Sequence, residues 1–351
     1  MTTPILNTAD LLDGTANRLI IQATLKPVAN KTRFQPAGFP EIGHVIYDAP
    51  DGRKVCIVDS AASMANHLET VCVNPFDLQL VDELSGLPYV QCVTDDKKDR
   101  LVVTSLSEGH RMASTYFLDG TEDGKKFGEK LREQFGIQNL GNRSHPLPND
   151  WWNVFNTIFR YDPNSLVHGI LFPALGIKLP RILTATLDAF DATRVGTAGV
   201  KFDKLGKTNS GQPIFAKDEE TASEIRATFV IDLSLIRSFG RADSGLNAAQ
   251  KQLLLGLALW KIGKLLSASF RFRSECDLEL DTLSIDGSSA EISALRIDIS
   301  ALIQASAFQD PRITKVYWKA DDLFKAEKDK KQSDDGDNTN ETSDDADQQS
   351  E

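Results

Sequence analysis

The chain has 351 residues, of which 41% are hydrophobic and 25% are charged, as in an ordinary soluble globular protein. This length predicts one large domain or two small ones with a sizeable core. The start, MTTPILNTADLLDG, lacks the basic and apolar regions of a secretory signal. The longest apolar run, Leu253 to Trp260, is too short to cross a membrane. We therefore expect a cytoplasmic protein with no membrane contact.

The acidic residues are unevenly distributed. The net charge is −11, but residues 332–351 hold 8 of the 50 acidic residues and no Lys or Arg. Without this segment, 39 basic residues face 42 acidic ones, a net charge of −3. Nucleic-acid binding responds to local charge, so a basic groove on the body is compatible with this composition. The sequence predicts a disordered acidic tail over residues 327–351, which serves solubility or mimics a polyanion.

The first elements show clear periodicity. Leu19, Ile21, Ala23 and Leu25 alternate with polar residues, which predicts a half-buried strand ending at Pro27. The segments HVIYDA and RKVCIVD flank a Pro-Asp-Gly turn and predict a hairpin. A helical stripe follows over residues 61–72, with Asp59 or Ser60 as its N-cap.

The rest of the chain mixes strands and helices. Strands are expected at LPYVQCV and RLVVTSL, at residues 225–233, at 270–280 and near 295–299, and helices around 122–135, 150–160 and 246–266. Residues 195–222 are rich in Gly and Lys and predict a long loop or a projecting hairpin. These elements favour a single α+β fold with one sheet.

The residues that carry metal or nucleophilic chemistry do not cluster in the sequence. The five histidines are not spaced as zinc ligands, and His168 in SLVHGILF is expected to be a hydrogen-bonded core residue. Gly206-Lys207-Thr208 resembles the end of a P-loop, but Lys201 stands where that motif requires Gly. The four cysteines form no CxxC pair and are expected to be small core residues, namely Cys56, Cys72, Cys92 and Cys276. The sequence therefore predicts neither an enzyme nor a metal or organic cofactor.

Basic residues suggest contact with nucleic acid. Lys26, Lys31 and Arg33 lie around one loop with Phe34 between them, a mixture used for single-stranded RNA and also found in ordinary solvated loops. Arg271 and Arg273 lie two residues apart on one expected strand face. They are predicted either to hold adjacent phosphates or to pair with Glu275 or a carboxylate of a neighbouring strand. No string typical of a conventional RRM platform occurs.

Six strings spread over residues 18–280 resemble one known family. They are RFQPAGFPEIGHVIY, VDSAASMANHLE, TSLSEGHRMASTYF, YDPNSLVHGILF, LPRILTATLDAFDATRVGTAGVKFDKLG and LLLGLALWKIGKLLSASFRFRSECDLE. In order and spacing they are similar to the backbone subunit of type I-G (formerly I-U) CRISPR Cascade complexes. The acidic tail lies outside this resemblance.

The resemblance implies a modified RRM-like (ferredoxin-like) core with long insertions that form fingers and a thumb. We expect residues 1–326 to form this single RNA-binding domain, with 195–222 as a mobile loop or the thumb. Subunits of this family polymerise helically along crRNA, displace a base at regular intervals and leave the others free to pair with target DNA. The implied partners are crRNA, target DNA through the guide, copies of the subunit, the large and crRNA-processing Cascade subunits and a recruited helicase-nuclease.

The resemblance also selects RNA-binding candidates. They are Lys26 at the end of the first strand, Arg33 and Gln35 in RFQP, Ser60, Ser63 and Asn66 in SAASMAN, His110 and Arg111 in EGHR, and the pair Arg271 and Arg273. A helix that starts at Ser60 adds free backbone N–H groups, which can donate hydrogen bonds to a phosphate. His67 stands where the family pattern has Arg, so a permanent cation is not expected there.

Two other functions remain open from the sequence. The chain is alternatively an RNA-processing ribonuclease on the same fold, with His110 as its titratable group. It is otherwise a protein-only scaffold that recruits a partner through the acidic tail.

Overall fold

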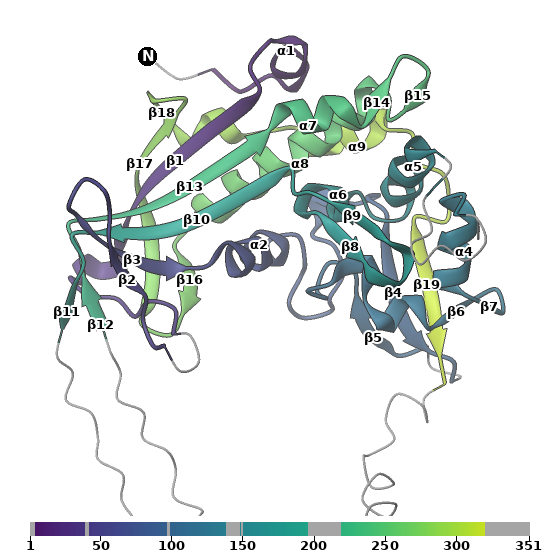
Figure 1. The fold of residues 1–351 in the computed structure, drawn as a ribbon, viewed down its shortest axis with the longest axis horizontal. Coiled ribbons are helices and arrows are strands. Elements are labelled where there is room, and N and C mark those ends of the chain that lie inside the picture. The colour runs from purple at the N-terminus through teal and green to yellow at the C-terminus, as the bar shows by residue number, and fades with distance from the viewer. Residues whose placement is uncertain are drawn as a thin grey trace, which may run out of the picture.

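The largest sheet has the strand order β16-β17-β1-β13-β10-β3-β2, with β18 paired to β17. The computed structural model describes residues 4–38, 42–96, 99–137, 148, 150–195 and 219–319. The strands are β1 (Arg18–Pro27), β2 (Ile46–Asp48), β3 (Lys54–Asp59), β10 (Leu183–Phe190), β13 (Glu224–Asp232), β16 (Phe270–Arg273), β17 (Cys276–Ile285) and β18 (Ser288–Ala290). All their pairings are antiparallel, and β1, β13 and β10 run side by side in Figure 1.

Alternation along β1 sets the two faces of this sheet. The side chains of Leu19, Ile21, Ala23 and Leu25 are buried, at most 5% exposed, which confirms the predicted strand. They belong to the core, with helices α2 (Ala61–Thr70) and α8 (Ala248–Leu266) packed against the sheet. The opposite face is partly open, and its central row joins neutral polar side chains across the sheet, namely Ser284, Gln22, Thr228 and Thr186.

Helix α8 is the central helix of the molecule. Asn247 caps it and exchanges hydrogen bonds with Gln250 in a capping box. Its residues are apolar nearly all round and most are buried, as the sequence predicted. Helices α1 (Thr8–Asp13), α7 (Leu233–Ser238) and α9 (Ile299–Ala305) contact α8, and α7, α8 and α9 run along the same side of the sheet in Figure 1.

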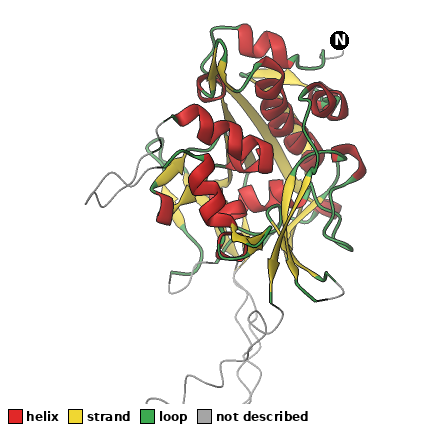
Figure 2. Cartoon of the chain, turned by 90° about the vertical axis from the view of Figure 1, so that its right-hand side faces the viewer, coloured by secondary structure: helices red, strands yellow, loops and turns green. Residues whose placement is uncertain are grey.

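A second sheet has the order β5-β4-β19-β6-β7 and lies to the right in Figure 1. Its strands are β4 (Tyr89–Thr94), β5 (Leu101–Thr104), β6 (Thr121–Glu122), β7 (Lys125–Lys126) and β19 (Ile313–Trp318). Strand β19 pairs in parallel with β4, so the end of the described chain returns to complete a sheet begun much earlier. In the turned view of Figure 2, helices and strands are mixed throughout, which confirms an α+β fold.

The remaining elements are short. The helices are α3 (Thr115–Leu118), α4 (Phe127–Gln134), α5 (Trp151–Tyr161) and α6 (Pro163–His168), with 3-10 turns at Val28–Asn30, Asp82–Leu84, Arg111–Ala113, Pro173–Leu175 and Ile292–Leu295. The two-stranded hairpins are β8 (Ile170–Phe172) with β9 (Ile177–Leu179), β11 (Thr193–Val195) with β12 (Glu219–Thr221), and β14 (Gly240–Arg241) with β15 (Ser244–Gly245).

Three predictions about elements need correction. The strand expected over 270–280 is a hairpin of β16 and β17, because the chain turns at Glu275, whose φ is 61°. The strand expected near 295–299 is wrong: a 3-10 turn ends at Leu295 and α9 begins at Ile299. The expectation of one sheet is also wrong, because β5-β4-β19-β6-β7 form a second sheet. The loop or projecting hairpin expected over 195–222 needs no correction, and paired strands β11 and β12 bound it.

Several predictions concern residues outside the described part of the chain. Residues 196–218, which include the Gly206-Lys207-Thr208 string, and the acidic tail lie there. Within the described part, all four cysteines are buried free thiols and His168 is 1% exposed, as expected. None of the helices placed there has the length and apolar character needed to cross a membrane.

Candidate nucleic-acid interface

The end of β1 and the loop after it form a basic surface, here called the strand-end surface. It comprises Lys26, Lys31 and Arg33, whose side chains are 48%, 58% and 60% exposed. Both lysines and the buried Phe34 line a pocket of about 370 Å³. The prediction that these three cations surround one loop is therefore confirmed.

Carboxylates from distant parts of the chain face each of these cations. The pairs are Lys26 with Asp281 (3.3 Å) and Glu279 (3.9 Å), Lys31 with Glu275 (3.8 Å) and Arg33 with Glu219 (2.9 Å). The two lysine pairs are exposed on both sides and contribute only about 0–1 kcal/mol each, whereas the Glu219 side chain is only 12% exposed. A phosphate that binds here therefore exchanges with a weakly held carboxylate.

Backbone contacts fix the loop that presents Arg33. Phe34 and Glu220 exchange two backbone hydrogen bonds of 2.9 Å, so the loop extends the β11–β12 hairpin. The Glu220 carboxylate is fully buried and accepts a hydrogen bond from Arg194 at 3.3 Å. The backbone at Phe34 is thus anchored while the neighbouring Arg33 side chain remains exposed.

Arg271 and Arg273 have different surroundings, although the sequence placed them on one face. The Arg271 side chain is 70% exposed and pairs with Asp277 on β17 at 2.6 Å. The alternative in which it pairs with a neighbouring strand's carboxylate is therefore confirmed. A register irregularity separates the two arginines along β16.

Arg273 instead ties the β16–β17 hairpin to the start of α2. Its guanidinium donates to the Val58 carbonyl and to the Asp59 carboxylate, both at 2.7 Å, and its side chain is 23% exposed. Gln35 joins the same junction, because its backbone N–H donates to the Glu275 carbonyl at 3.0 Å. These contacts give Arg273 a structural role and leave the Gln35 side chain as the candidate.

Ser60 is the N-cap of α2, as predicted. Its hydroxyl accepts a hydrogen bond from the Ser63 N–H at 3.2 Å, which satisfies one of the free donors of the first turn. The Ser63 hydroxyl lies 3.4 Å from Nε2 of His67. The Asp59 carboxylate lies 3.1 Å from the same His67 nitrogen, so this histidine is held next to a carboxylate.

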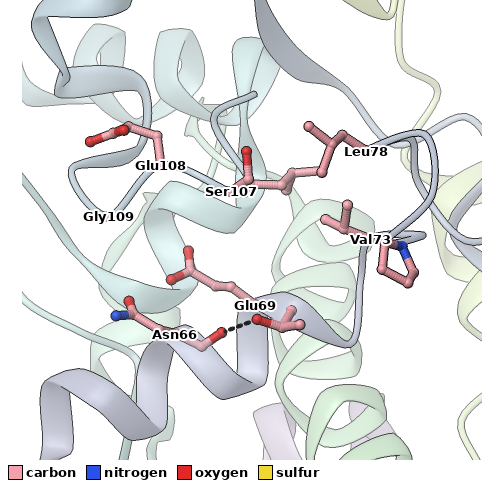
Figure 3. A pocket seen from close by; sticks show the side chains of 10 residues that line it. Asn66, Glu69, Val73, Leu78, Ser107, Glu108 and Gly109 are labelled. Carbon is pink, nitrogen blue, oxygen red and sulfur yellow. Dashed lines mark hydrogen bonds between the residues drawn. The ribbon is translucent and has the colours of Figure 1, made fainter. Parts of the chain in front are cut away.

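Asn66 lines a pocket of about 340 Å³ on the exposed side of α2 (Figure 3). The pocket combines the carboxylates of Glu69 and Glu108 with apolar side chains such as Leu78. Figure 3 shows Glu108 on the turn opposite the helix. Arg111 pairs with Glu69, so Glu108 is the carboxylate of this pocket without a guanidinium partner among the described residues, and no cation in the lining favours a phosphate beside Asn66.

His110 and Arg111 follow each other but differ completely in exposure. The His110 side chain is 84% exposed, with Nδ1 3.3 Å from Glu108. Arg111 is buried. Its Nε donates to one carboxylate oxygen of Glu69 and a terminal nitrogen donates to the other, both at 2.7 Å. The Arg111 side chain is therefore held mainly in the core by Glu69, and it also lines the pocket between its turn and the β8–β9 hairpin.

Glu69 and Arg111 belong to a buried polar network between α2, α6 and α8. Asn164 donates to Glu69 at 2.8 Å and accepts from Lys261, whose ammonium lies 2.8 Å from His168. Burial raises the pKa of Asp162, in the same region, to about 6. No group of three or more His, Cys, Asp or Glu in the described part of the chain is arranged to hold a metal ion.

Comparison with known proteins identifies the family. Residues 19–194 match the model of the CRISPR-associated protein GSU0053 family, which is about half of the chain. The chain belongs to this family. The matched residues of this CRISPR-associated chain include the strand-end surface, α2 and the His110 turn, whereas α8 and the β16–β17 hairpin lie beyond them.

Other comparisons add little. No curated protein matches the chain. A crystal structure of Thermofilum pendens Csc2 is 12% identical, with 86% of this chain and 76% of that chain covered and a TM-score of 0.31. A structure described as a CRISPR RNA-guided surveillance complex, pre-nicking, is also 12% identical, with coverages of 76% and 75% and a TM-score of 0.39. At these TM-scores neither similarity carries an argument.

Proposed function

We propose that this chain is a non-catalytic, crRNA-binding backbone subunit of a type I-G CRISPR surveillance (Cascade) complex, which polymerises along the guide and presents it to target DNA. The observation that carries this proposal is the family match, since it spans the segments that hold most of the predicted RNA-binding residues. The six strings that resemble the Cascade backbone subunit support the same function.

The chemistry of the strand-end surface suits a guide of any sequence. Lys26, Lys31 and Arg33 are exposed cations on an anchored loop. Cations of this kind contact phosphates, and phosphate contacts fix position without reading bases. A subunit that carries many different spacers needs this property, because sequence reading is left to base pairing.

The topology supports an RRM-like core with insertions. The central strand order β17-β1-β13-β10, with α2 before β10 and α8 before β17, follows the β-α-β-β-α-β arrangement. The central row of its open face is neutral and without aromatic rings, at Ser284, Gln22, Thr228 and Thr186. We therefore place the guide along the strand-end surface and the start of α2 rather than across this row.

The proposed partners follow from the proposed complex. They are crRNA, target DNA through the guide, further copies of this chain, the large and crRNA-processing subunits and a helicase-nuclease, in a prokaryotic cytoplasm.

Light scattering tests the proposal. The purified chain is expected to form heterogeneous oligomers that become a defined assembly when guide RNA is added. A strict monomer in both states contradicts the proposal. Cleavage of the guide by the purified chain, lost in His110→Ala, establishes the ribonuclease alternative instead.

A further inference from the structure

A second basic region lies on the far side of the Gly109–Arg111 turn from the acidic pocket of Figure 3. It is a pocket of about 290 Å³ between this turn and the β8–β9 hairpin, lined by Lys178 and Arg181 among others. We call it the basic pocket. We infer that it binds a phosphate group of single-stranded RNA, an inference that rests on the proposed function.

The charges of this pocket are available to a ligand. Within the described residues, neither Lys178 nor Arg181 forms an ion pair with a carboxylate. Arg181 donates a hydrogen bond from one terminal nitrogen to the Ala61 carbonyl at 3.2 Å, which orients its guanidinium. The remaining donors of this planar group match the oxygens of a phosphate.

A buried histidine forms part of the pocket wall. His168 lines the pocket, and burial together with the charges of Lys261, Arg111 and Arg181 holds its pKa well below its usual value. The Lys261 ammonium can only donate, so Nε2 of His168 accepts and its proton lies on Nδ1. This Nδ1 has no hydrogen-bond partner among the described residues.

The walls of the pocket are fixed before any ligand arrives. Glu69 holds Arg111 through two hydrogen bonds of 2.7 Å, and Arg111 contacts the Gly169 carbonyl at 3.3 Å. The turn and the start of β8 are therefore tied together. A preorganised site loses little entropy when it binds a phosphate.

The position of the pocket favours RNA over a free anion. The contact between Arg181 and Ala61 places it beside the first turn of α2, next to the Ser60 cap. Helix α2 thus connects it to the junction that bears Gln35 and the strand-end surface. A chain of phosphates can occupy both regions, whereas a single anion cannot.

The test uses Lys178→Ala with Arg181→Gln, because Gln removes the charge of Arg181 and keeps a polar side chain there. The measurement is affinity for labelled single-stranded RNA of two unrelated sequences across a salt series. Loss of two phosphate contacts is expected to flatten the log–log salt dependence by about 1.4, since each contact with a single strand contributes about 0.7. Lys126→Ala with Lys315→Ala removes two exposed, carboxylate-paired lysines from the second sheet and is expected to leave the slope unchanged.

Two results separate the failure of this inference from that of the proposed function. If the double variant keeps the wild-type salt dependence and the wild type binds RNA normally, the role of the basic pocket in RNA binding is overturned and the proposed function stands. This holds even if calorimetry shows that the pocket binds inorganic phosphate. Failure of the wild type to bind RNA overturns the proposed function and this inference with it. If the double variant does not fold, the exposed Lys178→Ala alone is expected to flatten the slope by about 0.7.

Discussion

The strand-end surface and the basic pocket both present cations, but they differ in whether a carboxylate already faces each cation. Lys26, Lys31 and Arg33 each face a carboxylate, whereas Lys178 and Arg181 have none among the described residues. The carboxylates at the first surface come from β12, β17 and the β16–β17 turn, far away in sequence. A cluster of basic residues in the sequence therefore does not predict how available their charges are.

The largest expected effect is on the free energy of unfolding, which should fall more when a buried ion pair loses its cation than when a partly exposed pair does. Arg111→Ala leaves Glu69 buried without its charge partner and is expected to lower the free energy of unfolding by about 3–5 kcal/mol. Arg33→Ala breaks a pair in which Arg33 is 60% exposed and Glu219 only 12% exposed, and it is expected to cost about 1–2 kcal/mol. Urea unfolding of both variants measures this difference. Equal losses would remove the distinction between the two regions.

A second test is the pH dependence of stability that the buried Asp162 is expected to produce. The pKa of Asp162 is raised to about 6 by burial, above its ordinary value of 3.8. A raised carboxyl pKa stabilises the folded protein at low pH, and this contribution is lost as pH rises through the folded pKa. Relative to Asp162→Asn, the wild type is therefore expected to lose about 2 kcal/mol between about pH 4.5 and 7.

Urea unfolding of both proteins at several pH values measures this change. Ser165→Ala removes the hydrogen bond of 2.7 Å that lowers the pKa of Asp162 but keeps the carboxyl, so it is expected to retain the pH dependence or deepen it. A stability difference between wild type and Asp162→Asn that does not vary with pH would contradict the raised pKa.

The smallest expected effect is on RNA affinity when the carboxylate that pairs with Arg33 is removed. Glu219→Gln removes the carboxylate 2.9 Å from Nε of Arg33 and is expected to strengthen RNA binding by about fivefold, because solvent around the 60% exposed Arg33 screens the pair to about 1 kcal/mol. Fluorescence anisotropy with labelled RNA measures the affinity. Glu129→Gln, at an exposed position on α4, is the matched control. Unchanged or weaker binding in Glu219→Gln would show that the carboxylate does not compete with RNA.

The sequence predicted local features better than long-range contacts. The alternation at Leu19 to Leu25 and the Ser60 cap depend on neighbouring residues, and both predictions are confirmed. The pair of Glu69 with Arg111 joins positions 42 apart, and nothing in the local pattern marks it. The local sequence therefore gave no sign that the Arg111 side chain is buried.

The sequence around the basic pocket predicts the exposure of a lysine but not its surroundings. Lys178 alternates with the buried Ile177 and Leu179, a pattern that predicts an exposed side chain on a short strand. Its availability, however, depends on the absence of a nearby carboxylate, which requires the tertiary structure. The hairpin turn at Glu275 was missed for a related reason, because a non-glycine residue with positive φ leaves little trace in a periodic pattern.

The central claim is that the strand-end surface holds the phosphates of a guide without reading its sequence. It is tested most directly by Lys26→Ala with Arg33→Ala, measured as affinity for two unrelated RNA sequences across a salt series. Both side chains are about half exposed or more, so the fold is expected to persist. The account predicts a similar loss for both sequences and a salt slope flatter by about 1.4, with Lys126→Ala plus Lys315→Ala unchanged. An unchanged slope, or a loss confined to one sequence, would contradict it.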